Sequence, residues 1–261
     1  MDAEFCGVVN RHFPDGERYI RVLMDVNEQD VVVVQNTFPD KKIVELLLIL
    51  QAVKEAGAKT VTCVIPYMGY SRQERIFQSG EARSAKAIAS VIGGMCDRVF
   101  TINVHTPEIL KFFGCEANDI NGSREVVRYL KGFGPDMVIA PDEGSRDRCT
   151  LAADLLKVPV HVMKKVRIDG RTVETSSGQI NVKGSTAVIL DDIISTGGTI
   201  ATAANILREG GAERVIAACT HGLFIEDAAN RLRVCDDILS SDTLEGVYTR
   251  FSVAPAIADA L

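Results

Sequence analysis

Two adjacent carboxylates stand between a short apolar run and a loop of hydroxyl and glycine residues. The run covers residues 187–190, the acids are Asp191 and Asp192, and the loop reads Ser195-Thr-Gly-Gly-Thr199. A short apolar run of this kind is typical of a strand buried on both faces of a parallel sheet. Residues 200–208 favour a helix, which two glycines then end. The pattern predicts a strand that ends at the acids, then a loop, then a helix.

Such a loop can bind an anion, because the free backbone N–H groups at the start of a helix point at one spot. Gly197 and Gly198 allow close approach to a phosphate, and hydroxyls of Ser195, Thr196 and Thr199 add donors. The two carboxylates repel a phosphate, but they suit the vicinal hydroxyls of a sugar or a divalent cation. We therefore predict a pocket for a phosphorylated sugar. The alternative is an ordinary strand–turn–helix unit with an acidic N-cap.

Other polar residues follow other predicted strands. Arg72 and Gln73 come after an apolar run and a Tyr-rich turn, where Arg offers a planar fork for phosphate or stacking. His105 and Asp142 also stand at strand ends, which is where open parallel sheets bind ligands. Each has a plainer interpretation: a solvated loop for Arg72 and Gln73, a structural histidine, and a helix N-cap for Asp142.

Two further segments carry turn or charge signals. Residues 12–17 contain Pro-Asp-Gly between two β-like runs, which predicts a hairpin. Residues 164–184 are polar and include glycines, and we expect a mobile flap there. Lys164-Lys-Val-Arg167 on this flap either faces solvent or closes over a transferring phosphate and offsets its charge.

Strands and helices alternate along the chain, which predicts parallel sheets flanked by helices. No flexible linker or low-complexity segment separates the two halves. The expected strands are 31–35, 60–65, 99–104, 137–140, 158–163, 187–190 and 214–219, and the expected helices are 42–56, 81–92, 124–129, 146–156, 200–208 and 226–232.

Composition limits the class of protein. The chain has 261 residues and a net charge of −6, which argues against a general nucleic-acid binder. Seven scattered cysteines form no C-x-x-C pair, a pattern that favours a reducing cytoplasm and no zinc site. No apolar run is long enough to span a membrane, and we expect neither a membrane segment nor a signal peptide.

Taken together, the motifs resemble those of one family, in order, across nearly the whole chain. Phe13-Pro-Asp-Gly-Glu17, Pro66-Tyr-Met-Gly-Tyr-Ser-Arg-Gln73, His105-Thr-Pro-Glu, Ala140-Pro-Asp142, Lys164-Lys-Val-Arg167, Asp191-Asp-Ile-Ile-Ser-Thr-Gly-Gly-Thr199 and Cys219-Thr-His221 look like ribose-phosphate pyrophosphokinases, most of all their archaeal branch. The resemblance implies two tandem domains like those of type I phosphoribosyltransferases, each a mainly parallel sheet flanked by helices. We expect the first at 1–122, lacking the usual first strand and helix, and the second at 123–261.

The resemblance also implies an activity. The enzyme would transfer the β,γ-diphosphoryl group of ATP to the 1-hydroxyl of ribose 5-phosphate, with Mg²⁺, giving 5-phosphoribosyl 1-pyrophosphate and AMP. It implies a homo-oligomer in which the 13–17 hairpin reaches a neighbouring subunit's ATP site. The implied roles are ribose 5-phosphate binding by Arg167, Asp191, Asp192, Ser195, Thr196, Gly197, Gly198 and Thr199, ATP binding by Phe13, Asp15, Gly16, Glu17, Arg72, Gln73 and His105, metal binding by His105 and Asp142, and catalysis by Lys165 and Arg167.

Some positions depart from the family's pattern. Asn103 stands where many bacterial members have an aspartate, and Glu143 and residues 146–148 differ from the commonest glycine-rich loop. Two alternatives stay open. One is a phosphoribosyltransferase, which would share only the loop at 187–200. The other is a non-catalytic regulatory paralogue of the same fold.

Overall fold

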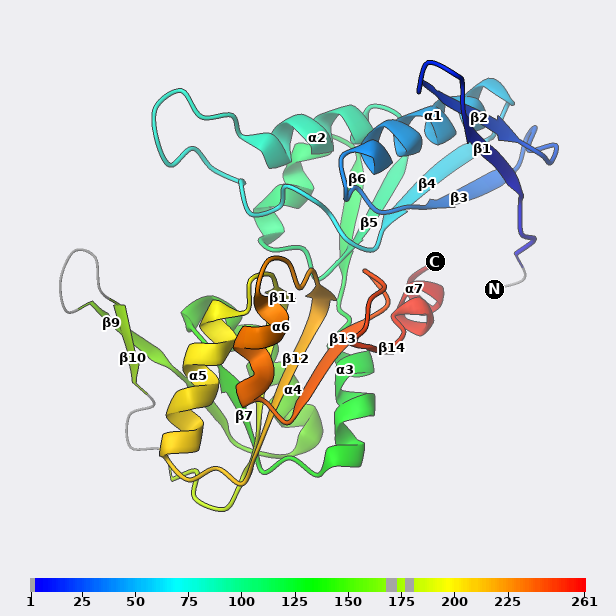
Figure 1. Ribbon diagram of the computed structural model, residues 1–261. Coiled ribbons are helices and arrows are strands. Elements are labelled where there is room, and N and C mark those ends of the chain that lie inside the picture. The colour runs from blue at the N-terminus through cyan, green and yellow to red at the C-terminus, as the bar shows by residue number, and fades with distance from the viewer. Residues whose placement is uncertain (1–2, 168–172, 177–180) are drawn as a thin grey trace. The chain divides into compact units, whose positions relative to one another are not determined.

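The computed structural model describes residues 3–167, 173–176 and 181–261, without the side chains of 164–167 and 173–176. The chain forms two compact units, one ending at Ile120 and the other running from Asn121 to Ala260. Figure 1 shows the elements of each unit.

The first unit contains a hairpin and a four-stranded parallel sheet. The sheet order β3-β4-β5-β6 follows the chain, so every crossover steps in the same direction. Its elements are β1 (Val8–His12), β2 (Arg18–Val22), β3 (Asp30–Val34), α1 (Lys41–Glu55), β4 (Thr60–Ile65), α2 (Ser84–Gly93), β5 (Arg98–Ile102), the 3₁₀ helix η1 (Pro107–Phe112) and β6 (Glu116–Ile120).

Both crossover helices of this unit cover the same face of the sheet. Right-handed crossovers that always step one way place their helices on one side, and Figure 1 shows α1 and α2 together there. Leu46 and Leu50 of α1 and Ile92 of α2 pack with Val33 and Cys63 of the strands in one core cluster. We expected helices on both faces of a sheet, and in this unit the two crossover helices lie on one.

The hairpin is attached to α1 through a buried acid. The carboxylate of Glu45 forms ion pairs with Arg18 of β2, at 3.4 Å, and with Lys42, at 2.9 Å. Gln35, just after β3, donates to the same carboxylate. Burial acts to raise the pKa of Glu45, but hydrogen bonds with Lys42 and Asn10 and the charges of Lys42 and Arg18 lower it overall. Glu45 thus connects the hairpin, the helix and the sheet.

The second unit is a six-stranded parallel sheet in the order β14-β13-β12-β11-β7-β8. A separate antiparallel pair, β9 and β10, stands apart from this sheet. The elements are α3 (Ser123–Leu130), η2 (Lys131–Phe133), β7 (Met137–Ala140), η3 (Glu143–Ser145), α4 (Arg146–Leu156), β8 (Val160–Val162), β9 (Lys164–Arg167), β10 (Val173–Ser176), β11 (Thr186–Ile194), α5 (Gly198–Glu209), β12 (Arg214–Gly222), α6 (Ala228–Arg231), η4 (Leu232–Val234), β13 (Asp237–Ser241), β14 (Thr249–Phe251) and α7 (Ala254–Ala260).

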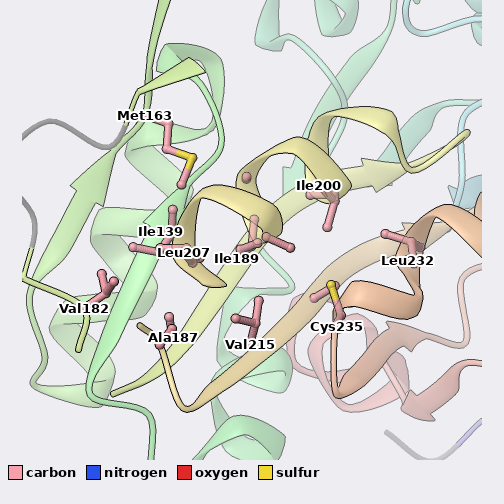
Figure 2. Close-up of a cluster of buried hydrophobic side chains, with 14 of the residues drawn as sticks. Ile139, Met163, Val182, Ala187, Ile189, Ile200, Leu207, Val215, Leu232 and Cys235 are labelled. Carbon is pink, nitrogen blue, oxygen red and sulfur yellow. The ribbon is translucent and has the colours of Figure 1, made fainter. Parts of the chain in front are cut away.

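The central strands of this sheet are buried on both faces, as their apolar runs predict. One core lies under α5, where Ile189, Val215 and Leu207 meet (Figure 2). A second core lies on the opposite face, where Val188 and Leu190 pack with residues of α3 and α4. Because β11 is clamped from both sides, the residues at its carboxyl end are held in fixed positions.

The predicted strands and helices are found close to their expected bounds, with two kinds of difference. β11 continues through Asp191 and Asp192 to Ile194, because β12 pairs with it that far; the prediction that the strand ends at the acids was wrong. β6, β13, β14 and α7 were not predicted. Among the helices that the structure describes, none is long and apolar enough to cross a membrane.

Candidate active site

The loop at 195–199, which we call the phosphate loop, follows β11 at the point where the strand order of the second unit's sheet reverses. β7 and β11 are neighbours, and the chain leads from β7 outward to β8 but from β11 the other way to β12. The carboxyl ends of two such strands border a crevice where open α/β sheets bind ligands. Asp142 follows β7, and Asp191 and Asp192 lie in the last part of β11.

Arg148 of α4 joins the two acids. Its Nη1 donates to Oδ1 of Asp191 at 3.2 Å and to Oδ1 of Asp192 at 3.1 Å. The exposed fractions of the three side chains are 20% for Arg148, 17% for Asp191 and 6% for Asp192. The positive charge of one guanidinium therefore offsets part of the negative charge of two carboxylates at a site with little exposure to solvent.

The pKa of Asp191 is raised well above its usual range. Burial is the main cause, the neighbouring charge of Asp192 adds to it, and Arg148 acts in the opposite direction. A ligand that donates hydroxyl hydrogens to this carboxylate would favour its charged form. The site is therefore suited to a partner that brings hydrogen-bond donors.

The loop between β11 and α5 has the backbone of an anion site. Gly197 adopts φ +75° and ψ 0°, in the left-handed region, and Gly198 is the first residue of α5. A left-handed residue followed by a right-handed one turns successive N–H groups toward one concave side. The first hydrogen bond of the helix is donated by Ala201 N–H to the Gly197 carbonyl at 2.9 Å. The N–H groups before Ala201 are those that a helix start leaves for a ligand.

Asp142 acts as the N-cap of the turn that follows β7. Its Oδ1 accepts hydrogen bonds from Ser145 N–H at 3.2 Å and from Ser145 Oγ at 3.1 Å. The capping interpretation considered for this residue therefore applies. Asp142 is only partly buried.

In the first unit, Arg72 and Gln73 lie on the long loop between β4 and α2. Gln73 Nε2 donates to Glu81 Oε2 at 3.3 Å, and the same oxygen accepts Phe77 N–H at 2.7 Å and Gln78 N–H at 3.0 Å. These backbone bonds lower the pKa of Glu81. Glu81 therefore links residues 73, 77 and 78 of this loop and orients the Gln73 side chain. The side chain of Arg72 is exposed.

His105 follows β5 on a turn that is fixed by an aspartate of the neighbouring strand. Oδ1 of Asp119, in β6, accepts Thr101 Oγ1 at 2.6 Å and Val104 N–H at 2.9 Å. Asn103, within this turn, has a left-handed φ of +43°, which asparagine tolerates better than most residues. The turn that presents His105 is thus specified by Asp119 and Asn103.

The hairpin residues form the expected turn. Gly16 has φ +93°, and Glu17 N–H donates to Asp15 Oδ1 at 3.0 Å. The ring of Phe13 packs edge-on against that of Tyr19, with the ring centroids 5.6 Å apart, and Phe13 is 44% exposed. Asp15 and Gly16 make the turn, and the exposed Phe13 ring and Glu17 are presented to the surroundings.

The flap cations lie on a separate two-stranded ribbon. Lys165 and Arg167 lie on β9, which pairs with β10 as an antiparallel ribbon. Their side chains lie outside the described part of the structure, as do residues 168–172 and 177–180.

The expected metal ligands His105 and Asp142 are not part of a preformed protein metal site among the residues that the structure describes. In the described part of the chain, no three His, Cys, Asp or Glu side chains form a group that could hold a metal ion. Mg²⁺ commonly binds through one or two carboxylates together with substrate phosphates. The partly buried Asp142 carboxylate fits that mode, and His105, a nitrogen ligand, suits this hard cation less well.

Sequence reasoning missed Arg148, Glu81 and Asp119. The contacts of Arg148 with the two acids span 43 and 44 residues, so no local pattern reveals them. Glu81 follows a glycine and was predicted as the first residue of the helix at 81–92, whereas α2 begins at Ser84 and Glu81 belongs to the loop. Asp119 lies in a strand that itself was not predicted.

Comparison with known proteins identifies relatives of both units. Residues 1–95 match the family described as the N-terminal domain of ribose phosphate pyrophosphokinase, and residues 121–253 match the phosphoribosyl transferase domain family. Among curated proteins, a ribose-phosphate pyrophosphokinase of Methanothermobacter thermautotrophicus is 39% identical over 100% of this chain and 93% of its own length. A ribose-phosphate pyrophosphokinase of Methanosarcina mazei is 40% identical over 95% of this chain and 84% of its own.

A solved structure of a related enzyme has a similar fold. The phosphoribosylpyrophosphate synthetase of Mycobacterium smegmatis superposes with a TM-score of 0.85, at 29% sequence identity, covering 99% of this chain and 90% of that one. The similarity extends over both units, whereas a likeness to phosphoribosyltransferases alone would concern only the second.

Proposed function

The chain belongs to the ribose-phosphate pyrophosphokinase family, and we propose which of its residues carry out the family's reaction. It is an ATP-dependent transferase that moves the β,γ-diphosphoryl group of ATP to the 1-hydroxyl of ribose 5-phosphate, forming 5-phosphoribosyl 1-pyrophosphate and AMP. The observation that carries this function is the match of both units, in order, at 39% identity over the full chain. Neither a phosphoribosyltransferase nor a non-catalytic paralogue is favoured.

We assign ribose 5-phosphate to the β11–α5 loop. The 5-phosphate accepts hydrogen bonds from the N–H groups of Gly197, Gly198 and Thr199 and from the hydroxyls of Ser195, Thr196 and Thr199. Asp191 accepts the ribose hydroxyls, with Asp192 beside it. The left-handed Gly197 and the Arg148 bridge support this assignment.

ATP is assigned to residues of the first unit. Arg72 and Gln73 hold the nucleotide, and His105 assists at the end of β5. The support is the loop built by Glu81, which keeps Gln73 oriented before any ligand binds. Phe13, Asp15, Gly16 and Glu17 complete a nucleotide site in a neighbouring subunit, so the enzyme is a homo-oligomer. The exposed Phe13 ring is available for that role.

Magnesium is the proposed cofactor, which Asp142 would bind together with phosphate oxygens, and the resemblance gives His105 a metal-binding role as well. When bound, the ion neutralises charge on the transferred diphosphoryl group. Asp142 is already oriented by Ser145, and an ionised carboxylate can accept several hydrogen bonds or bind a cation.

Lys165 and Arg167 are the proposed catalytic cations, and Arg167 also contacts ribose 5-phosphate. Phosphoryl transfer depends on positioning and on charge stabilisation, so cations that meet the transferred group in the transition state contribute directly to rate. Because all seven cysteines are free thiols, we further propose that the enzyme works in the reducing cytoplasm.

The experiment that tests the function is a product assay. Purified protein with ATP, Mg²⁺ and ribose 5-phosphate should release AMP in step with 5-phosphoribosyl 1-pyrophosphate. Omission of ribose 5-phosphate or chelation of the metal should stop both products. ADP in place of AMP, or no product with any combination, would contradict the proposal.

A further inference from the structure

The phosphate loop is tied to a segment that lies 30 to 36 residues further along the chain. Arg231, the last residue of α6, donates from Nη1 to the carbonyl oxygen of Thr196 at 3.1 Å. Just before α6, Ile225 N–H donates to the carbonyl oxygen of Ser195, also at 3.1 Å. Two consecutive carbonyls of the loop are therefore held by one segment.

Holding these carbonyls fixes the direction of the next N–H groups. In a trans peptide, the C=O of one residue and the N–H of the following residue point in opposite directions. When Arg231 holds the Thr196 carbonyl, the N–H of Gly197 must point away from Arg231. Gly197 is left-handed and Gly198 begins α5, so that N–H joins those of the next two residues on the concave side of the loop.

A buried side chain of the same segment packs against Gly197. Leu232 is fully buried, and a Cβ placed on Gly197 would lie 3.0 Å from its Cγ. Figure 2 shows Leu232 beside Ile200 of α5 in the core under that helix. Leu232 therefore limits the space on that side of Gly197, and the Arg231 bond holds the orientation of the peptide between Thr196 and Gly197.

We propose that Arg231 is a positioning residue for the phosphate site: by holding the Thr196 carbonyl, it aims the Gly197 N–H at the 5-phosphate of ribose 5-phosphate. This inference rests on the proposed function. Arg231 acts through its hydrogen bond rather than through its charge. Its side chain is 41% exposed, and Glu226 lies 3.9 Å away, so solvent and a neighbouring acid screen that charge.

The test compares Arg231→Met with Arg231→Lys and with the matched control Arg233→Met. Arg233 is also an exposed arginine, two residues along the same segment, so the control removes one equal charge. The dissociation constant of ribose 5-phosphate is measured by calorimetry with Mg²⁺ and α,β-methylene ATP, which cannot transfer its diphosphoryl group. The same titrations are repeated at high salt, and thermal unfolding checks that each variant is folded.

We expect Arg231→Met to weaken ribose 5-phosphate binding about tenfold, the order of one lost hydrogen bond to an ionised donor. The loss should persist at high salt, Arg231→Lys should recover most of it, and Arg233→Met should bind as the wild type does. The KM for ATP should change much less than the KM for ribose 5-phosphate.

Three results would overturn the inference: unchanged affinity in Arg231→Met, equal losses in Arg231→Met and Arg233→Met, or a loss that disappears at high salt. If Arg231→Met does not fold, Arg231→Ala against Arg233→Ala makes the same comparison, because alanine also removes the hydrogen-bond donor and the charge. A wild-type protein that does not bind ribose 5-phosphate at all would instead contradict the proposed function itself.

Discussion

Asp191 occupies a place where its charge is unfavourable without a ligand. It is buried, it lies beside Asp192, and both acids share the guanidinium of Arg148. Such an arrangement lowers the stability of the free protein and is relieved by a ligand that donates hydrogen bonds. The residue is thus better explained by binding than by folding.

Asp191→Asn should weaken ribose 5-phosphate binding while making the free protein more stable at neutral pH. The folded pKa of Asp191 is raised, so the folded state binds more protons than the unfolded state between about pH 4, the unfolded value, and the raised folded value. Wild-type stability therefore falls as pH rises through that window, and the asparagine variant escapes this fall. Thermal unfolding of both proteins from pH 4.5 to 8 measures the difference.

The binding side of this prediction includes Asp192→Asn as a second variant. Calorimetry should show weaker binding of ribose 5-phosphate in both variants, with the folded structure retained. Unchanged affinity in both would remove the assignment of a sugar phosphate to this loop.

Lys165→Ala and Arg167→Ala should each lower the turnover rate by roughly a hundredfold or more. A cation that meets the transferring diphosphoryl group only in the transition state affects rate rather than ground-state binding, and the loss of one such contact costs about 2.7–4 kcal/mol. The Michaelis constants should shift much less, apart from some added loss of ribose 5-phosphate binding in Arg167→Ala. Steady-state kinetics measures this, with the exposed Lys131→Ala as control. Near-normal turnover in both variants would mean that these cations only face solvent.

At the scale of elements, the loop between β4 and α2 is organised by one acid. Glu81 accepts two backbone N–H groups and the Gln73 side chain on a single oxygen. The loop is long and exposed, so hydrogen bonds to this carboxylate, rather than apolar packing, stabilise its conformation.

Glu81→Ala should raise the KM for ATP about tenfold and leave the KM for ribose 5-phosphate nearly unchanged. The reason is that Gln73 loses its orientation, and the bonds lost are of the order of one net hydrogen bond or more. The control is Glu55→Ala, which removes an exposed acid of α1 that accepts one side-chain bond from Gln51. An ATP constant that stays at the wild-type value would show that Glu81 does not position the nucleotide site.

Elements with a strong apolar pattern could be predicted from the sequence, and those without one could not. β4 and β7 were predicted at their observed bounds, because both are short apolar runs that are buried on both sides. β6 reads Glu-Ala-Asn-Asp-Ile and β13 reads Asp-Ile-Leu-Ser-Ser, so neither has enough apolar residues to signal a strand. Pairing with β5 and β12 makes them strands, and that is a tertiary effect.

The candidate site shows the same division. The acids and the glycine loop could be recognised from residue types and their order, but the left-handed Gly197, the Arg148 bridge and the Arg231 contact could not. Each of these depends on a partner brought near by the fold, 35 or more residues away in the chain for the two arginines.

At the scale of the whole molecule, we expect a homo-oligomer. The hairpin presents Phe13 to solvent on a turn made by Asp15 and Gly16, and an exposed aromatic ring at a hairpin tip suits a contact with another subunit. Sedimentation velocity should show a species larger than the 28.3 kDa chain. A clean monomer with full activity would contradict the prediction.

The central claim is that the chain transfers a diphosphoryl group from ATP to ribose 5-phosphate, and the position of a label tests it most directly. The protein is incubated with ATP labelled at the β-phosphorus, Mg²⁺ and ribose 5-phosphate, and the products are separated. We predict that the label appears in 5-phosphoribosyl 1-pyrophosphate and that the AMP released is unlabelled. Label retained in ADP, or no labelled sugar product, would contradict the account.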